Sequence, residues 1–287
     1  MSSAAAAGFD LAAYMRDRAR QVDEALERFL PAQGPYLGNI GEVMRYGLFP
    51  GGKRFRPVLT LASCEALGGR SEVALPAACA FEMIHCFSLI HDDLPCMDND
   101  DFRRGKPTAH RQYGEAAALL AGDGLSIWAF HVASRCPAPP ADVLRVVREL
   151  AEAAGHPGMV GGQVLDMDAQ ARGVDGPGLL AVHRAKTGAL IRGAVRCGAI
   201  LGGAGEAQLE ALTGYGERVG LVFQITDDIL DAGSDPDPVS FPALFGMEES
   251  RRMAREATME ALDLLSGLGE PALPLRSLAL YLLDRET

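Results

Sequence analysis

Two clusters of aspartates are the residues of this chain best suited to chemistry. Each cluster contains three carboxylates: Asp92, Asp93 and Asp98 in the first, and Asp227, Asp228 and Asp231 in the second. Carboxylates crowded this closely repel one another, so a purely structural role would rarely repeat that cost. Magnesium ions prefer oxygen ligands, and an ion held by one or two carboxylates also takes up substrate phosphates. Two facing clusters therefore predict a pocket for a magnesium diphosphate, with all six aspartates as candidate metal ligands.

The first cluster has two other interpretations. It could cap the end of a helix, or it could bind calcium, because Asp98-Asn99-Asp100 begins like a calcium loop. Such a loop needs glycine at its sixth position and glutamate at its twelfth. Arg103 and Ala109 stand there instead. The pattern therefore favours magnesium over calcium.

Lysine is rare in this chain and occurs at only three positions, Lys53, Lys106 and Lys186. Lys53 follows two glycines, and Arg56 lies about one helical turn further on. Glycines allow close backbone approach, and helix N-termini attract anions. Two cations at this spacing suit a phosphate group. Taken alone, such a run is more often a solvated loop, and the segment Lys186-Thr187-Gly188 is a weaker signal still.

The composition excludes several classes of function. The formal charge of −11 argues against nucleic acid or an anionic membrane as the main partner. No apolar run approaches the ~20 residues of a membrane span, and the N-terminus has no signal-peptide pattern. Six cysteines without a CxxC pair are typical of buried thiols in a reducing compartment. We therefore expect a cytoplasmic protein without an integral membrane segment.

Helical periodicity, broken at glycine and proline, runs along almost the whole chain. The predicted helices cover residues 9–30, 40–48, 56–67, 73–97, 116–135, 141–154, 179–201, 206–231, 244–265 and 275–285. No alternating strand of useful length is present. The expected fold is an all-α, single-domain antiparallel bundle over residues 1–287, with residues 1–8 as a disordered tail.

Taken together, these segments resemble the trans-prenyltransferases, the short-chain polyprenyl diphosphate synthases. The similarity covers the chain from about residue 10 onwards, in matching order and spacing. The matching stretches are residues 51–57, 88–110, 122–123, 161–168, 183–188 and 220–231. The resemblance implies the isoprenoid synthase fold with a deep central cavity, a homodimer and the use of magnesium, with three ions expected and manganese as a possible substitute.

The resemblance also implies a reaction and residue roles. An allylic diphosphate loses its diphosphate, and the resulting cation is attacked by isopentenyl diphosphate. Metal ions stabilise the leaving group. Direct metal ligands would be Asp92, Asp98 and Asp227, with the other three aspartates as second choices. The resemblance assigns the allylic diphosphate and its metal shell to Arg103, Lys186, Thr187 and Gln224. It assigns the isopentenyl diphosphate to Gly52, Lys53, Arg56, His85 and Arg104, although His85 is equally consistent with a core histidine.

Product length is predicted from the residues about one turn before Asp92, which should face the channel for the growing chain. Phe87 and Ser88 occupy these positions. In the family, an aromatic residue here accompanies a fifteen-carbon product. We therefore expect farnesyl diphosphate, with geranylgeranyl diphosphate as the alternative, because residues 94–110 also resemble plant geranylgeranyl enzymes.

The segment after Asp231 departs from the family pattern. It is about a dozen residues shorter than usual, and Pro238 stands where the family has a lysine. Either the segment is truly short, which predicts weak activity, or a flexible stretch is missing from the sequence; the second reading is preferred. Two further function classes remain as alternatives: a non-catalytic partner of another prenyltransferase, and a terpene cyclase, which would not need Lys53, Arg56 and Arg104.

Overall fold

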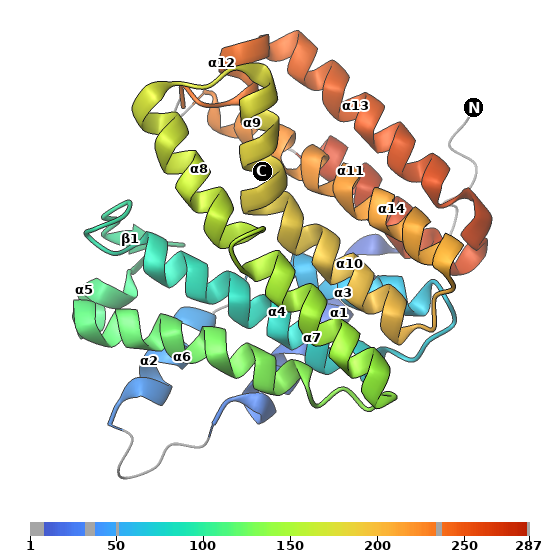
Figure 1. The fold of residues 1–287 in the computed structure, drawn as a ribbon, viewed down its shortest axis with the longest axis horizontal. Coiled ribbons are helices and arrows are strands. Elements are labelled where there is room, and N and C mark those ends of the chain that lie inside the picture. The colour runs from blue at the N-terminus through green and yellow to red at the C-terminus, as the bar shows by residue number, and fades with distance from the viewer. Residues whose placement is uncertain (1–8, 32–37, 50–51, 234–236, 286–287) are drawn as a thin grey trace.

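The computed structural model describes residues 9–31, 38–49, 52–233 and 237–285, and within them the chain is almost entirely helical (Figure 1). The predicted tail, residues 1–8, and Gly51 lie outside the described residues. The elements are α1 (Leu11–Phe29), α2 (Ile40–Leu48), α3 (Phe55–Glu65), α4 (Ser71–Asp92), β1 (Phe102–Arg103), β2 (Lys106–Pro107), α5 (Ala109–Tyr113), α6 (Glu115–Ala133), α7 (Pro140–Ala154), α8 (Met159–Arg172), α9 (Gly176–His183), η1 (Arg184–Gly188), α10 (Ala189–Leu201), α11 (Glu206–Asp231), α12 (Phe241–Phe245), α13 (Met247–Leu264), η2 (Ser266–Leu268), η3 (Glu270–Ala272) and α14 (Leu273–Asp284).

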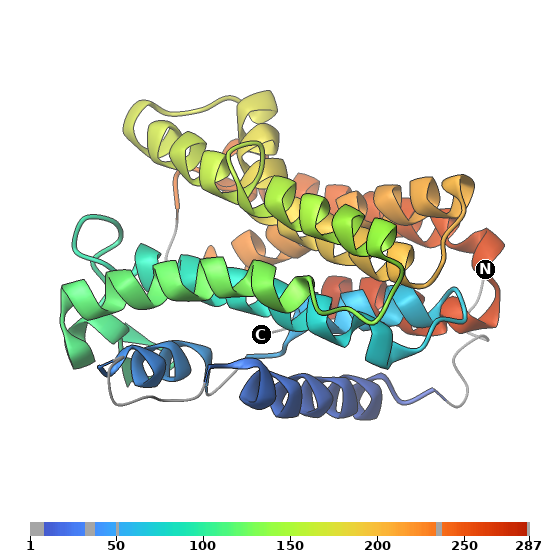
Figure 2. The ribbon, with the colours of Figure 1, turned by 60° about the horizontal axis from the view of Figure 1, so that its bottom comes forward.

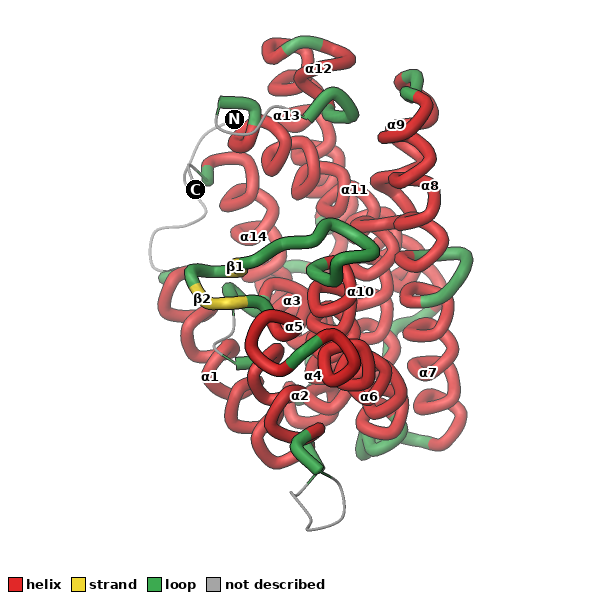
Figure 3. The backbone as a smooth tube through the Cα atoms, turned by 90° about the vertical axis from the view of Figure 1, so that its left-hand side faces the viewer, coloured by secondary structure: helices red, strands yellow, loops and turns green. Residues whose placement is uncertain are grey.

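The two helices that end in the aspartate clusters, α4 and α11, are held apart by α3 and α10. Helix α4 packs against α3, α6 and α10, and α11 packs against α10 and α13. Figure 2 shows α1 and α2 along one side of the bundle and α8 with α9 on the other. The tube in Figure 3 shows the loop after α4 lying across one end of the helices. The predicted all-α bundle is therefore confirmed.

Helix α4 was predicted to continue to Met97, and this was wrong, because it ends at Asp92. Pro95 disfavours helical geometry in the residue before it, so the helix cannot run through this point. The chain turns back instead, and the backbone N–H of Asp98 donates to the carbonyl oxygen of Asp92 at 2.8 Å. The turn thereby brings Asp98 back toward Asp92, whereas a continuous helix would have pointed residues six apart to different faces.

Several elements were not predicted. Helix α8 was missed because glycines interrupt its first turns and its apolar residues do not form one buried stripe: Val160, Val164, Leu165 and Met167 are all exposed. The two-residue strands β1 and β2 form a small antiparallel hairpin, and α5 and α12 are helices of five residues. The predicted helix 179–201 is a continuous α9–η1–α10 run with π-helical geometry at its centre.

Within the described part of the chain, two helices, α4 and α6, are long and apolar enough to cross a membrane by length and composition alone, contrary to the expectation that no run approached that length. The apolar window of α4 is 67% buried inside the structure, as in the core helix of a helical bundle, whereas that of α6 is 39% buried. All six cysteines are free thiols, and five are buried. The expectation of burial was wrong for Cys96, which lies exposed in the turn after α4.

Candidate active site

A cavity of about 670 Å³ opens between α4, α8, α10 and α11. Residues from distant parts of the sequence line it together. Of the predicted site residues, the cavity wall contains Arg56, His85, Phe87, Ser88, Asp92, Lys186, Thr187, Gln224 and Asp227. Apolar side chains complete the wall: Leu119, Met159, Val160, Val164, Met167 and Leu190 are among them. The cavity thus has a polar end between the aspartate clusters and an apolar remainder.

In the first cluster, the three aspartates have different environments. Asp92 lines the cavity, and burial raises its pKa to about 6; Lys186 opposes the rise and Asp98 adds to it. Asp98 is exposed in the turn, and its pKa is raised chiefly by partial desolvation. Asp93 is buried and turned away from the cavity, where it accepts from Arg103 Nε at 2.7 Å. Asp92 and Asp98 therefore carry the carboxylates available to a ligand.

The second cluster divides in the same way. Asp227 faces the cavity and pairs with Arg285 Nη2 at 2.8 Å. Asp228 accepts from Gln224 Nε2 at 2.8 Å and from the backbone N–H of Phe241 at 2.9 Å, and burial raises its pKa to about 6. Asp231 is exposed at the end of α11 and does not line the cavity. Asp228 thus ties α11 to the chain that follows it.

Lys186 and Thr187 lie in the π-helical turn η1, which departs from the α-helices on both sides of it. Such bulges occur frequently at functional sites because they re-aim side chains. Lys186 Nζ contacts Asp166 Oδ2 at 2.5 Å, and Thr187 Oγ1 donates to Gln224 Oε1 at 2.9 Å. Gly162 permits α8 to approach this turn closely, since a Cβ there would lie 2.2 Å from the backbone nitrogen of Lys186.

A group of basic side chains gathers next to the polar end of the cavity. The buried Nε of Arg56 has no hydrogen-bond partner among the described residues, and the guanidinium lies 5.9 Å from the centre of the Phe223 ring. Burial, followed by the charges of Arg56 and Arg104, holds the pKa of His85 well below its usual range, so the imidazole is neutral. The guanidinium of Arg104 lies against Gly52. A Cβ added at Gly52 would be only 2.8 Å from Arg104 Nη2.

Lys53 follows Gly52 directly in the sequence, and its Nζ lies 5.8 Å from the centre of the Tyr281 ring. The contact of Gly52 with Arg104 makes residues 52–57 and 103–104 neighbours in the fold, although about 50 residues separate them in the sequence. These clustered cations raise the local positive potential in a protein with a net negative charge, which favours an anionic ligand here.

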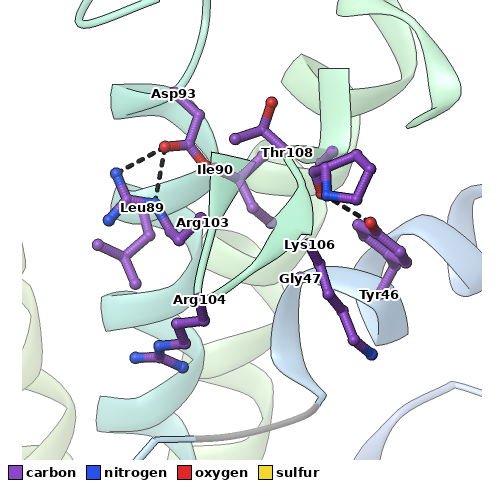
Figure 4. A pocket seen from close by; sticks show the side chains of 11 residues that line it. Tyr46, Gly47, Leu89, Ile90, Asp93, Arg103, Arg104, Lys106 and Thr108 are labelled. Atoms are coloured by element: carbon purple, nitrogen blue, oxygen red, sulfur yellow. Dashed lines mark hydrogen bonds and ion pairs between the residues drawn. The ribbon is translucent and has the colours of Figure 1, made fainter. Parts of the chain in front are cut away.

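Figure 4 shows the small cavity of about 60 Å³ between the β1–β2 hairpin and α4. Arg103 points to Asp93, whereas Arg104 turns away from the hairpin along the helix. Arg103 Nη2 also contacts Asp100 at 3.3 Å. Arg103 therefore fixes the loop that carries the first cluster. An allylic diphosphate could contact this guanidinium, as predicted, only if it shared it with Asp93 and Asp100.

The donor set fits a hard divalent cation in its chemistry. Asp92 and Asp227 present carboxylate oxygens to one cavity, and burial is the main cause of the raised pKa of Asp92. Among the described residues, no three carboxylates, imidazoles or thiols converge into a ready-made metal site. Magnesium in such a setting completes its shell with water and substrate phosphate oxygens. The residues fit a metal that binds together with a diphosphate.

Two residues of the site were missed in the sequence. Asp166, which pairs with Lys186, lies in the matched stretch 161–168 but was not assigned to the site. Arg285, which pairs with Asp227, had no local signal, since only the packing of α14 brings it to α11.

The comparisons with known proteins agree with this geometry. The family model for polyprenyl synthetase matches residues 38–242. The chain belongs to the polyprenyl synthetase family. It is 44% identical to the heterodimeric geranylgeranyl pyrophosphate synthase large subunit 1 of Arabidopsis thaliana, over 97% of this chain and 80% of that protein. It is 45% identical to a chloroplastic geranylgeranyl pyrophosphate synthase of Catharanthus roseus, over 97% and 82%.

A solved structure supports the same assignment. An FPP/GFPP synthase from Zymomonas mobilis superposes with a TM-score of 0.90 at 39% identity, covering 95% of this chain and 98% of that one. The isoprenoid synthase fold is thereby confirmed, and the chain is a prenyltransferase of the polyprenyl synthetase family. The relatives differ in the product lengths their names state, so family membership leaves the product of this chain open.

Proposed function

We propose that this polyprenyl synthetase condenses isopentenyl diphosphate with dimethylallyl or geranyl diphosphate, with magnesium, to give farnesyl diphosphate. The observation that carries the product assignment is the place of Phe87. Its ring lies in the wall of the central cavity on α4, about one turn before Asp92. A chain growing from the diphosphate end would meet this ring. An aromatic side chain at this depth acts as a floor.

Asp92 and Asp227 are the proposed metal ligands, with Asp98 beside Asp92. Bound magnesium, with three ions expected and manganese as a substitute, would neutralise the diphosphate as it leaves. Lys186 is positioned by Asp166 and lies close enough to Asp92 to oppose the rise in its pKa that burial causes. This lysine and Thr187 can therefore donate to the same leaving group.

Asp93, Asp228 and Asp231 are better described as supporting residues. Asp93 accepts from Arg103, and Asp228 accepts from Gln224 and a backbone N–H. A carboxylate already engaged in two hydrogen bonds has fewer oxygen lone pairs to offer a metal. Arg103 would hold the allylic diphosphate only as an addition to its contact with Asp93.

The isopentenyl diphosphate site is proposed at Lys53, Arg56 and Arg104, with neutral His85 next to them. The unpartnered Nε of Arg56 supports this, since a buried donor without an acceptor costs about 1–3 kcal/mol, which a bound diphosphate would offset. Gly52 leaves space for Arg104 at the same place. Apolar side chains along the rest of the cavity exclude water, which would quench a carbocation.

Geranylgeranyl diphosphate is the second candidate product. Both plant relatives named above are geranylgeranyl pyrophosphate synthases, at 44% and 45% identity. Several exposed apolar residues of α6 and α8 border the cavity, and a longer chain could pass between these helices beyond Phe87. The farnesyl product therefore depends on whether the Phe87 ring stays in place.

The short segment after Asp231 bears on the level of activity. Its described part is well anchored: Gln170 Nε2 donates to both oxygens of Asp237 at 3.1 Å, and Phe241 is fully buried. A missing stretch is the preferred reading of this segment, and the alternative is a truly short connection. The site would then have one cation fewer than the family pattern, and weak activity or a partner-subunit role would follow.

A homodimer in the cytoplasm, with residues 1–287 as one domain, completes the proposal. The exposed apolar side chains Leu120 and Ile127, seven residues apart and so on one face of α6, support an interface. Size-exclusion chromatography with light scattering tests it, and a monomer at micromolar concentration would contradict it.

The product assay tests the function. Purified protein is incubated with isopentenyl diphosphate, an allylic diphosphate and magnesium, with or without EDTA, and the products are identified by mass. We expect farnesyl diphosphate that disappears with EDTA. A twenty-carbon product would replace the farnesyl assignment with the geranylgeranyl one. No product from either starter would favour the partner-subunit role.

A further inference from the structure

Phe87 does not stand alone in the cavity wall, because His91 lies one helical turn after it on α4. The two rings meet edge to face, with centroids 5.6 Å apart and planes at 79°. Residues four apart on a helix are neighbours on the same face. The imidazole also lines the cavity. The Phe87 ring therefore cannot rotate toward the aspartate end of the helix without displacing His91.

His91 is itself fixed to the neighbouring helix. Its Nε2 donates to the carbonyl oxygen of Leu119 on α6 at 3.0 Å, which requires the hydrogen to be on this nitrogen. The carboxylate of Asp123 lies 3.9 Å from the same atom. The hydrogen bond from His91 to the Leu119 carbonyl is an interaction in addition to the packing of the ring. It connects the α4 face that carries Phe87 to α6.

The position of the ring depends on a glycine of α6. A Cβ at Gly122 would lie 2.1 Å from His91 Nε2 and 2.4 Å from its Cδ2. Side chains never approach this closely, so any larger residue at Gly122 would displace the imidazole. Because Gly122 has no side chain, the imidazole of His91 can pack directly against α6, and the hydrogen bond to the Leu119 carbonyl holds the ring there.

We propose that His91 is a positioning residue for product length: it holds the Phe87 ring across the cavity and so keeps the floor closed. The proposal rests on the proposed role of Phe87 as the floor. His91 itself would not touch the reacting atoms. When it is removed, the Phe87 ring gains the space of the imidazole, and the product chain can grow past it.

The experiment compares product distributions with geranyl diphosphate and excess isopentenyl diphosphate, read by mass. Phe87→Ala and His91→Ala are each expected to raise the ratio of twenty-carbon to fifteen-carbon product at least tenfold. His91→Gln, whose amide can place a donor near the position of His91 Nε2 and so keep the bond to the Leu119 carbonyl, should fall between His91→Ala and the wild type. His131→Ala removes an exposed imidazole from α6 and serves as the matched control, with an unchanged ratio.

Gly122→Ala tests the same inference from the other helix, away from Asp92. It should raise the ratio when His91 is present and add nothing to His91→Ala, because the added methyl group acts only by displacing the imidazole. Melting curves check that each variant folds. The inference is overturned if Phe87→Ala lengthens the product while His91→Ala and Gly122→Ala do not. If Phe87→Ala itself leaves the product unchanged, the floor assignment fails instead.

Discussion

Arg54 and Glu82 form a buried ion pair that connects the two segments carrying the basic residues of the site. Arg54 Nη1 donates to Glu82 Oε1 at 2.6 Å, and both side chains are almost fully buried. Arg54 is in the left-handed conformation, with φ of 49°, and its Nη2 donates to the carbonyl oxygen of Leu48. Its neighbours in sequence include Arg56, while Glu82 lies one turn before His85. The pair thus sets the distance between the start of α3 and the middle of α4.

Removing Glu82 should destabilise the protein strongly. Glu82→Ala leaves the Arg54 guanidinium buried without its main partner, and breaking a buried pair in this way costs about 3–5 kcal/mol. Urea unfolding followed by circular dichroism measures the change. Glu24→Ala breaks an exposed pair with Arg20 and is the control, with an expected loss of about 0.5 kcal/mol or less. Equal losses of unfolding free energy in the two variants would show that the buried Arg54–Glu82 pair stabilises the protein no more than an exposed pair.

Gly162→Ala should disturb the π-helical turn and with it the allylic diphosphate site. The new methyl group would meet backbone atoms of Lys186, which cannot move aside like the end of a flexible side chain. We expect a stability loss of roughly 1–3 kcal/mol and a raised KM for the allylic substrate. Gly267→Ala meets no atom within 4 Å and should leave both quantities unchanged. A Gly162→Ala enzyme with wild-type kinetics would show that this close approach is not needed.

Substitutions at Asp227 and Asp228 should affect different properties, activity at Asp227 and stability at Asp228. Asp227→Asn removes a proposed metal ligand, so kcat should fall by at least a hundredfold while the melting temperature changes little. Asp228→Asn weakens the hydrogen bonds to Gln224 and to the Phe241 backbone, which predicts a loss of about 1–3 kcal/mol. Kinetics and thermal unfolding of both variants provide the test. The opposite pattern would exchange the roles of the two aspartates.

Stability should fall at alkaline pH because of the buried thiols. Burial raises the pKa of Cys64 and of Cys136 to about 11, from an unfolded value of 9.0. The folded state therefore holds these protons more tightly, so the stabilisation is complete below pH 9 and is lost as pH rises from 9 through 11, by about 1.4 kcal/mol for each unit of pKa difference.

Urea unfolding at pH 8, 9 and 10.5 measures this decline. Cys136→Ala should make the curve flatter between pH 9 and 10.5, whereas Cys96→Ser, at an exposed thiol, should leave its slope unchanged. The same slope in all three proteins would rule out a contribution from Cys136.

Much of the fold followed from local patterns. Helices α2 and α11 begin and end at the predicted residues, because glycine and proline at their ends stop the helical pattern. The end of α4 was misplaced by five residues, since a strongly apolar run hid the effect of Pro95. Helix α8 gave no usable pattern, because its apolar residues face a cavity and solvent rather than one packed neighbour.

The sequence alone determined the aspartate clusters and the glycine and lysine segment, and it suggested the proposed floor at Phe87, because side-chain chemistry and helical spacing are local properties. Which carboxylates face the cavity was decided only by the tertiary structure. Asp93 and Asp228 are chemically identical to Asp92 and Asp227, and they differ because Arg103 and the Phe241 backbone reach the former pair. The contact of His91 with α6 and that of Arg285 with Asp227 join residues far apart in the chain, and only packing brings such residues together.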